Sequence, residues 1–324
     1  MNSKRVLLSV GAVIAISGII GGVAITRKVP VAMKSEQSGS SVEQVLSVAD
    51  KPKSKPLKQK TSKPSIAKKE SADMSIARTP MLIWQQDFNA VDSSALDSRY
   101  WNVANSALPI YNEEQQIYSP GSSNVRVAGG RLILEAHNST SGITSGRVDT
   151  KGKVRVEQGT RLEASIKLPK GKGVWPAFWL LSDNQPHTAK LQPTESDWQS
   201  PRFYMRDGEI DIMEAYGTFP GVIEATAHTF GRSYEKQHNL PDSSDVFHTY
   251  WLEWHADKLV IGVDDTTYST YEKSGTSETW PFTRDNQFYV ILNLAMGGSG
   301  GGQITQSTGD NWRMEVDYIR YLQL

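Results

Sequence analysis

Three carboxylates stand within six residues of the segment Gly208-Glu209-Ile210-Asp211-Ile212-Met213-Glu214-Ala215-Tyr216-Gly217. Residues 209–212 alternate strictly between acidic and apolar side chains, which is typical of a strand with one polar and one buried face. In a helix, at about 100° per residue, Glu209 and Glu214 would lie well apart and the apolar residues would form no single stripe. The segment is therefore predicted to be a strand, with Glu209 and Asp211 on the same face.

Glu214 breaks this alternation because it lies five positions after Glu209, an odd offset. A regular strand would turn its carboxylate toward the core, where an unpaired charge costs several kcal/mol or must take up a proton. One extra residue near Ile212 and Met213, a β-bulge, would return Glu214 to the acidic face. Bulges are over-represented beside active sites.

An acidic row on an apolar-backed strand has a chemical use. Two carboxylates facing one groove can cleave a glycosidic bond, one as nucleophile and the other as acid and then base. A third carboxylate beside the nucleophile can share a proton with it. A solvated strand face and a Ca²⁺ site are the alternative interpretations of the row taken by itself.

The bulk composition excludes several classes. The chain has 324 residues and no cysteine, so it has no disulfide framework and no cysteine-ligated zinc. Residues 1–80 hold 14 Lys and Arg against 5 Asp and Glu, and the remainder holds 21 against 30. A basic head on an acidic body argues against nucleic acid as a partner of the C-terminal part.

The N-terminal quarter of the chain has the composition of an anchor followed by a spacer. Lys4 and Arg5 precede an uncharged run over residues 6–26, which is long enough to span a membrane and is followed at once by Arg27 and Lys28. We expect an apolar helix in residues 1–28, an uncleaved membrane anchor in preference to a cleaved signal peptide. Residues 29–79, rich in Lys, Pro and Ser, are expected to be a disordered linker.

Residues 80–324 are predicted to form one β-sandwich. Short apolar or alternating runs separated by turn residues recur throughout, and no helical stripe of ten residues stands out. The expected strands are 81–84, 125–127, 131–136, 161–168, 250–254, 259–263, 288–293 and 314–322.

Aromatic residues and a histidine flank the acidic segment. In the run 173–181, Trp175 and Trp179 fall on one strand face, where an indole can stack on a sugar ring; a place in the core is the equal alternative. His228 follows the acidic strand and could donate a hydrogen bond near the row, although a lone histidine is more often structural.

These motifs together resemble glycoside hydrolase family 16, and within it the laminarinase-like endo-β-1,3-glucanases. The resemblance runs through ordered segments over most of residues 81–322. They are 87–89, 112–119, the Ser-Gly-Arg turn at 145–147, 175–179, 208–214, 292–298 and 316–320.

The resemblance implies a concanavalin-like β-jelly-roll sandwich of two antiparallel sheets with a concave sugar-binding face. It implies that Glu209 is the nucleophile, Asp211 its electrostatic partner and Glu214 the acid/base. On the matching segments it places Asn112, Arg147, Trp175, Trp179 and Asn293 as substrate-binding residues. His228 is nominated with them from its position after the acidic strand. No cofactor is required for the chemistry; a structural Ca²⁺ is common in the family, and Asp317 is the one side chain nominated for it.

The expected function is therefore retaining hydrolysis, as an endo-glycosidase, of β-1,3 or mixed β-1,3/1,4 glucan or a related exopolysaccharide. The protein is expected to be exported and to act as a monomer, anchored to the membrane or secreted if residues 1–28 are cleaved. A transglycosylase and a non-catalytic carbohydrate-binding domain are the alternatives. The chain departs from the family pattern at residues 204–207, where a Trp-Pro pair is usual, and at 299–302, where Ser-Gly-Gly-Gly stands in place of a tryptophan. These departures leave the polysaccharide open.

Overall fold

The computed structural model describes residues 80–92, 94–105, 112–186, 205–230, 232–275, 279–305 and 312–324. The expected apolar helix in 1–28 and the expected linker 29–79 lie outside these ranges. Within them, no helix is both long enough and apolar enough to cross a membrane.

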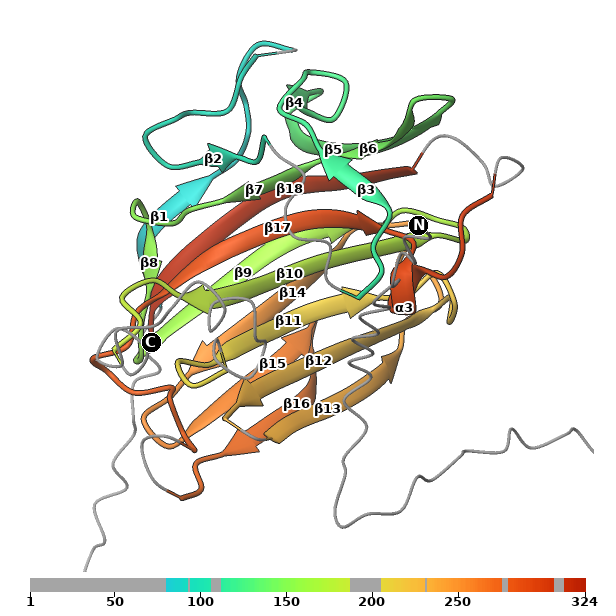
Figure 1. Ribbon diagram of the computed structural model, residues 1–324. Helices are drawn as coiled ribbons and strands as arrows, with labels where there is room; N and C mark the ends of the chain where they lie inside the picture. The colour runs from blue at the N-terminus through green and yellow to red at the C-terminus, as the bar shows by residue number, and fades with distance from the viewer. Residues whose placement is uncertain are drawn as a thin grey trace, which may run out of the picture. The chain divides into compact units, whose positions relative to one another are not determined.

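The described residues form two β-sheets (Figure 1). The strands of the larger sheet are β1 (Met81–Gln86), β3 (Gln116–Tyr118), β4 (Val125–Ala128), β5 (Arg131–Ser139), β6 (Gly142–Ser145), β9 (Thr160–Lys167), β14 (His248–Trp254), β15 (Lys258–Val263), β16 (Thr266–Glu272) and β18 (Trp312–Gln323). Their order is β16-β15-β14-β9-β18-β5-β6-β3, with β1 paired to β18 and β4 to β5.

The smaller sheet carries the acidic segment. Its strands are β2 (Asn102–Val103), β7 (Arg147–Asp149), β8 (Arg155–Val156), β10 (Val174–Ser182), β11 (Glu209–Ala215), β12 (Val222–Thr229), β13 (Arg232–Asn239) and β17 (Phe288–Met296). Their order is β13-β12-β11-β10-β17-β7-β2, with β8 paired to β17. The expectation of antiparallel pairing needs one correction, because β3 and β6 run parallel. The reason is that β3 does not join β6 through a hairpin but enters from the separate segment that follows residue 112.

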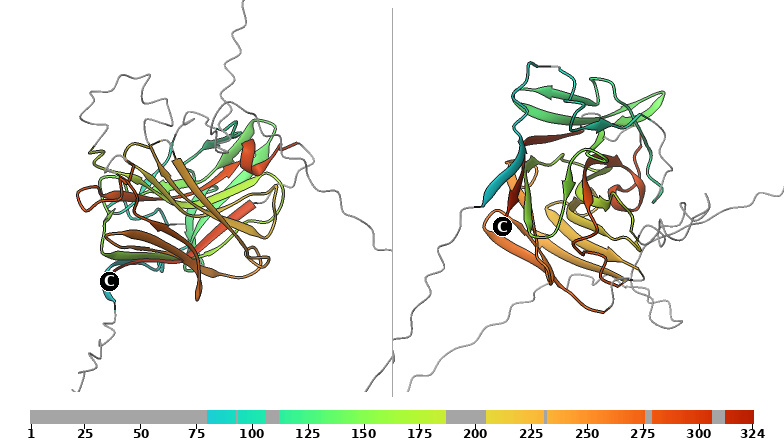
Figure 2. Two further views of the ribbon diagram at one scale, coloured as in Figure 1. Left: turned by 90° about the horizontal axis from the view of Figure 1, so that it is seen from below. Right: turned by 90° about the vertical axis from the view of Figure 1, so that its left-hand side faces the viewer.

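The two sheets pack face to face around a large apolar core, and a second, smaller buried cluster includes Val174, Leu294 and Trp312. Leu162, Ile166 and Leu252 of the larger sheet belong to the same buried cluster as Phe178 and Leu292 of the smaller one. Figure 2 shows the two layers from two further directions. The all-β sandwich expected from the alternating runs is confirmed, and α3 (Gly298–Gly301) is a single short turn of helix.

Strand β17 is an almost continuous apolar run because it is buried along its whole length. All nine of its residues are buried, because β10 and β7 flank it and the larger sheet covers one face. In a strand whose two faces are both covered, apolar residues such as Val, Ile and Leu follow one another without alternating polar residues. Asn293 is the polar exception in this run, and its side chain lies on the same face of the sheet as Trp179.

The predicted β-bulge in β11 is present and is visible from both neighbouring strands. Opposite β12, three steps from Asp211 to Glu214 match two steps from Thr226 to Glu224. Opposite β10, two steps from Asp211 to Met213 match one step on the partner strand. The Tyr268 hydroxyl on β16 of the opposite sheet donates a hydrogen bond to the carbonyl of Ile212 at the bulge. The carbonyl that the bulge frees from the strand ladder is therefore satisfied inside the core.

Candidate active site

The bulge brings the three carboxylates of β11 to the face that lies away from the core. Ile210, Ile212 and Met213 are fully buried in the core cluster. On the other face the side chain of Glu209 is 24% exposed and that of Asp211 only 4%. Asp211 is therefore covered by its neighbours, whereas Glu209 remains accessible to a ligand.

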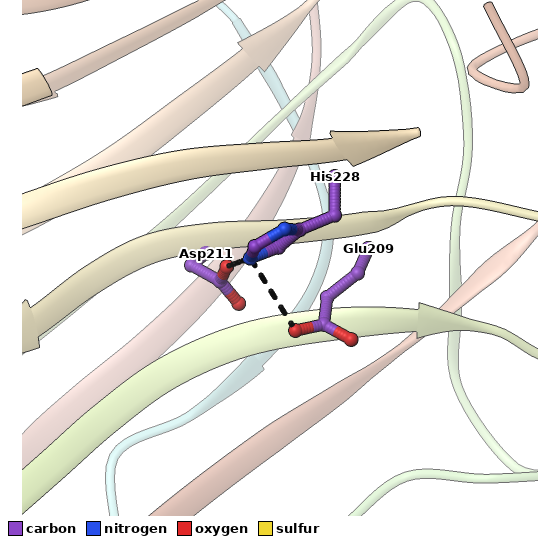
Figure 3. A group of neighbouring side chains, drawn as sticks. All are labelled: Glu209, Asp211 and His228. Carbon is purple, nitrogen blue, oxygen red and sulfur yellow. Dashed lines mark ion pairs between the residues drawn. The ribbon is translucent and has the colours of Figure 1, made fainter. Parts of the chain in front are cut away.

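His228 lies across from the first two carboxylates (Figure 3). Its Nε2 is 3.1 Å from Asp211 Oδ2 and 3.9 Å from Glu209 Oε1, and its Nδ1 is 2.7 Å from Ser233 Oγ. When the Ser233 hydroxyl donates to Nδ1, the ring proton sits on Nε2 and faces Asp211. The Asp211 Oδ2 atom is nevertheless buried without an aligned hydrogen-bond donor, which favours a proton on this carboxyl.

Burial and mutual repulsion raise the proton affinity of all three carboxyls. Burial, then the charge of Asp211, raise the pKa of Glu209 to about 8, while His228 opposes the rise. Burial, then Asp211, raise the pKa of Glu214 to about 8, while the Trp175 and Tyr216 donors oppose it. Burial, then the charge of Glu224, hold the pKa of Asp211 well above its usual range. A raised pKa is what a carboxyl acting as an acid near neutral pH needs.

Aromatic groups hold the carboxyl of Glu214. Trp175 Nε1 donates to Glu214 Oε1 at 2.8 Å, and the Tyr216 hydroxyl lies 3.0 Å from Glu214 Oε2. The two rings contact each other with centroids 5.6 Å apart. A Cβ at Gly300 of α3 would come within 2.6 Å of Trp175 and 2.7 Å of Tyr216. The glycine-rich departure from the family pattern therefore packs closely on the pair that holds Glu214.

A row of residues runs across the smaller sheet from Glu214. Ala177 lies directly between Glu214 on β11 and Asn293 on β17, and Asn293 in turn lies opposite Arg147 on β7. Because Ala177 is small, little side chain stands between Glu214 and Asn293.

Asn293 is held by two aromatic side chains. Trp179 Nε1 donates to Asn293 Oδ1 at 2.6 Å, and Asn293 Nδ2 donates to the Tyr118 hydroxyl at 3.1 Å. The guanidinium of Arg147 lies 5.2 Å from the centroid of Trp179. Trp175 and Trp179 are both half-buried on this face, and neither belongs to the core.

The two remaining nominated residues lie elsewhere. Asn112 comes near this part of the molecule through its backbone, since its carbonyl accepts a hydrogen bond from the Ser299 amide. Asp317 is exposed on β18 of the larger sheet, at a register shift between Val316 and Tyr318. Among the described residues, no group of three or more His, Asp or Glu side chains with metal-ligand spacing includes Asp317. The calcium assignment stays a prediction.

The group Glu209, Asp211 and His228 offers three ligand atoms within 4.8 Å of one another. Such a set has the composition of a cation site. Its place beside Glu214 and the tryptophans is also explained by proton handling, which needs carboxyls of raised pKa close together.

Sequence reasoning did not identify Tyr118, Tyr216 or Glu224. Glu224 lies four positions before His228 on the same strand, so alternation alone puts the two on one face. Tyr216 follows Glu214 by two positions, which was a similar signal. Tyr118 could not be found in this way, because only the pairing of β3 in the fold brings it to Asn293.

The comparison with known families agrees with this geometry. The family model described as glycosyl hydrolases family 16 matches residues 112–320. The chain is 33% identical over 257 residues to a β-glucanase of Rhodothermus marinus, which covers 74% of this chain and 84% of that protein. It is 30% identical over 275 residues to glucan endo-1,3-beta-glucosidase A1 of Niallia circulans, covering 74% of this chain and 37% of that longer protein.

Solved structures give the same result. The laminarinase of Rhodothermus marinus superposes with a TM-score of 0.66 at 30% identity, covering 76% of this chain and 99% of that one.

Proposed function

The chain belongs to the glycosyl hydrolases of family 16, and we propose that it cleaves internal β-1,3 or mixed β-1,3/1,4 bonds in a glucan or a related exopolysaccharide. One observation carries the proposal. The bulge in β11 puts Glu209, Asp211 and Glu214 on one face, beside the half-buried indoles of Trp175 and Trp179. Names of relatives such as β-glucanase support the substrate class.

In this mechanism Glu209 attacks the anomeric carbon while protonated Glu214 gives its proton to the departing glycosidic oxygen. The C–O bond to the leaving sugar breaks as the ester bond to Glu209 forms. Glu214, now ionised, takes a proton from water as the water oxygen bonds to the anomeric carbon and the ester bond to Glu209 breaks, so the configuration is retained. Retention requires the two carboxyl groups to be about 5–5.5 Å apart.

Asp211 and His228 set the charge on Glu209. With a proton on Asp211, the repulsion that raises the pKa of Glu209 is reduced, and Glu209 can ionise as a nucleophile must. His228 favours the ionised form of Glu209 from 3.9 Å away. Protons are thus kept on Asp211 and Glu214, and the negative charge falls on Glu209.

The test incubates the full chain with linear β-1,3-glucan, mixed-linkage β-glucan and bacterial exopolysaccharides, and the products are sized. Short oligosaccharides of mixed length are expected from at least one β-glucan. Glu209→Gln is the matched control, expected to keep the fold and to lose at least about 10³-fold in turnover, because the covalent intermediate cannot form. Absence of cleavage from the whole panel, or an unaffected Glu209→Gln variant, would exclude the proposal. Lengthened products at high acceptor concentration would indicate transglycosylation by the same residues.

We also propose that the protein is exported and held at the membrane by residues 1–28, with residues 29–79 as a spacer and the catalytic part acting as a monomer. The uncharged run between two basic pairs supports the anchor. Cell fractionation and N-terminal sequencing of the mature protein distinguish an anchor from a cleaved signal. Light scattering of the purified protein measures the oligomeric state.

Calcium at Asp317 is proposed only as a stabilising ion without a role in the reaction. If the ion binds, a chelator should lower the melting temperature of the wild-type protein and leave that of Asp317→Asn unchanged. Equal melting curves with and without chelator would remove the assignment.

A further inference from the structure

Glu224 is a fourth carboxylate, and it lies directly across from Glu214. The two residues are cross-strand partners in the pairing of β11 with β12, and their side chains share the face that carries the acidic row. Like charges placed directly opposite each other on neighbouring strands are destabilising. Glu224 is only 9% exposed, so water does little to screen the repulsion.

The Tyr216 hydroxyl lies between the two carboxyls. It is 3.0 Å from Glu214 Oε2 and 2.9 Å from Glu224 Oε1, and both distances are in the range of O–H···O hydrogen bonds. A phenol has one proton and can donate to only one of the two oxygens. For the other contact to be a hydrogen bond, that carboxyl must itself be protonated and donate to the phenol oxygen.

The outer atoms of the two carboxyls are occupied by fixed donors. Trp175 Nε1 donates to Glu214 Oε1, and Gln237 Nε2 donates to Glu224 Oε2 at 2.8 Å. Each carboxyl therefore points its other oxygen at Tyr216. Two arrangements satisfy every contact: protonated Glu214 donates to Tyr216, which donates to Glu224, or the same chain runs in reverse. Both hold one proton on the carboxyl pair.

We propose that Glu224 is a positioning residue that keeps a proton on the Glu214–Glu224 pair, with Tyr216 as the hydrogen-bonded link between the two carboxyls, so that Glu214 can serve as the acid at neutral pH. This inference rests on the proposed function of Glu214. The negative charge of Glu224 makes loss of the Glu214 proton unfavourable, while Tyr216 provides the hydrogen-bonded path that lets the two carboxyls share it. No proton is gained or lost by the pair until Glu214 gives one to the glycosidic oxygen.

Other titratable groups near Glu214 also influence its pKa. Asp211 and Glu209 lie on its own strand, His228 on β12, and Tyr268 approaches from β16. On β13, Glu235 lies opposite Thr226, on the same face as Glu224, and is exposed. The Tyr216 hydroxyl bridges Glu214 and Glu224, so removal of the Glu224 charge has a distinct expected signature.

The experiment measures the pH dependence of kcat/KM on a β-glucan with the full chain. Glu224→Gln keeps an acceptor for Tyr216 and removes the charge, so the basic limb should move to lower pH by on the order of one unit. Tyr216→Phe leaves the two carboxyls facing each other with no donor between them, so the basic limb should move to higher pH. Glu235→Gln is the matched control: it removes a charge from the same face at the position opposite Thr226, and the basic limb should stay in place.

An aryl glycoside with a very acidic leaving group provides a second control. Its departure needs no proton from Glu214, so the shift in kcat/KM caused by Glu224→Gln should disappear. A uniform loss of activity with unmoved limbs in both variants would reduce Tyr216 and Glu224 to structural residues and overturn the inference. A wild-type protein inactive on every glucan would instead refute the proposed function.

A readout that needs no turnover is also available. Infrared difference spectra at neutral pH should show fewer protonated carboxyl groups in Glu224→Gln than in the wild type, and an unchanged number in Glu235→Gln. An equal count in the wild type and in Glu224→Gln would contradict the shared proton even if the variant were inactive.

Discussion

Replacing Glu214 with glutamine should stabilise the folded protein at pH 8 and leave its stability nearly unchanged at pH 4. Burial and the charge of Asp211 raise the pKa of Glu214 from 4.5 to about 8 in the folded state. A raised pKa means that the folded state binds the proton more tightly than the unfolded chain does. This contribution is complete below the unfolded value and is lost as pH rises through the folded value.

The magnitude follows from the shift. At 1.36 kcal/mol per unit, the rise from 4.5 to about 8 corresponds to an upper limit of about 5 kcal/mol. The titration of Glu214 is coupled to that of Glu209 and Asp211, so only part of this free energy is recovered when Glu214 alone is replaced. We therefore expect a stabilisation of about 2–3 kcal/mol at pH 8. Glutamine fits the site as the neutral form does: its oxygen can accept from Trp175, and its amide can donate to Tyr216.

The assay is urea unfolding of the wild type and of Glu214→Gln at pH 4 and at pH 8. Glu272→Gln at the exposed end of β16 is the control for replacing a glutamate outside the acidic row. If Glu214→Gln changed the free energy of unfolding equally at pH 4 and pH 8, the carboxyl would not be held protonated by its surroundings. The reasoning about the acid/base would then be wrong.

Three further predictions concern the parts that position the site. Tyr268→Phe leaves the bulge carbonyl of Ile212 buried without a donor, so the free energy of unfolding should fall by about 1–3 kcal/mol. We also expect kcat to fall by more than KM rises; an unchanged kcat would show that this hydrogen bond to the bulge does not affect catalysis. Gly300→Ala puts a methyl group against Trp175, so the hydrogen bond from Trp175 Nε1 to Glu214 should be lost, kcat should fall, and the free energy of unfolding should fall by about 1–3 kcal/mol. Unchanged kcat and unchanged stability would show that α3 moves outward to make room for the methyl group. Proton NMR of the first product formed should show the β-anomer, and the α-anomer would contradict double displacement at Glu209.

Much of this site followed from local pattern. Alternation from Glu209 to Ile212 predicted a strand, and the odd offset of Glu214 required an extra residue that the register of both neighbouring strands confirms. The same local rule put Trp175 and Trp179 on one strand face, and the structure then showed that this face lies away from the core. Side-chain direction in a strand depends only on position along the chain, so one sequence is enough to infer it.

Partners across the sheet could not be inferred in this way. The donor to the Ile212 carbonyl is 56 positions away on the opposite sheet, and the acceptor of Trp179 is 114 positions away on β17. The encounter of Glu224 with Glu214 likewise depends on the register of β12 against a bulged β11. The alternation of residues along a strand and the types of their side chains are local properties of the sequence, and they were enough to predict a strand face that carries carboxylates beside aromatic residues. Strand order and register result from packing the whole core, and they alone decided that Tyr216 lies between two carboxyls and that Tyr268 supports the bulge.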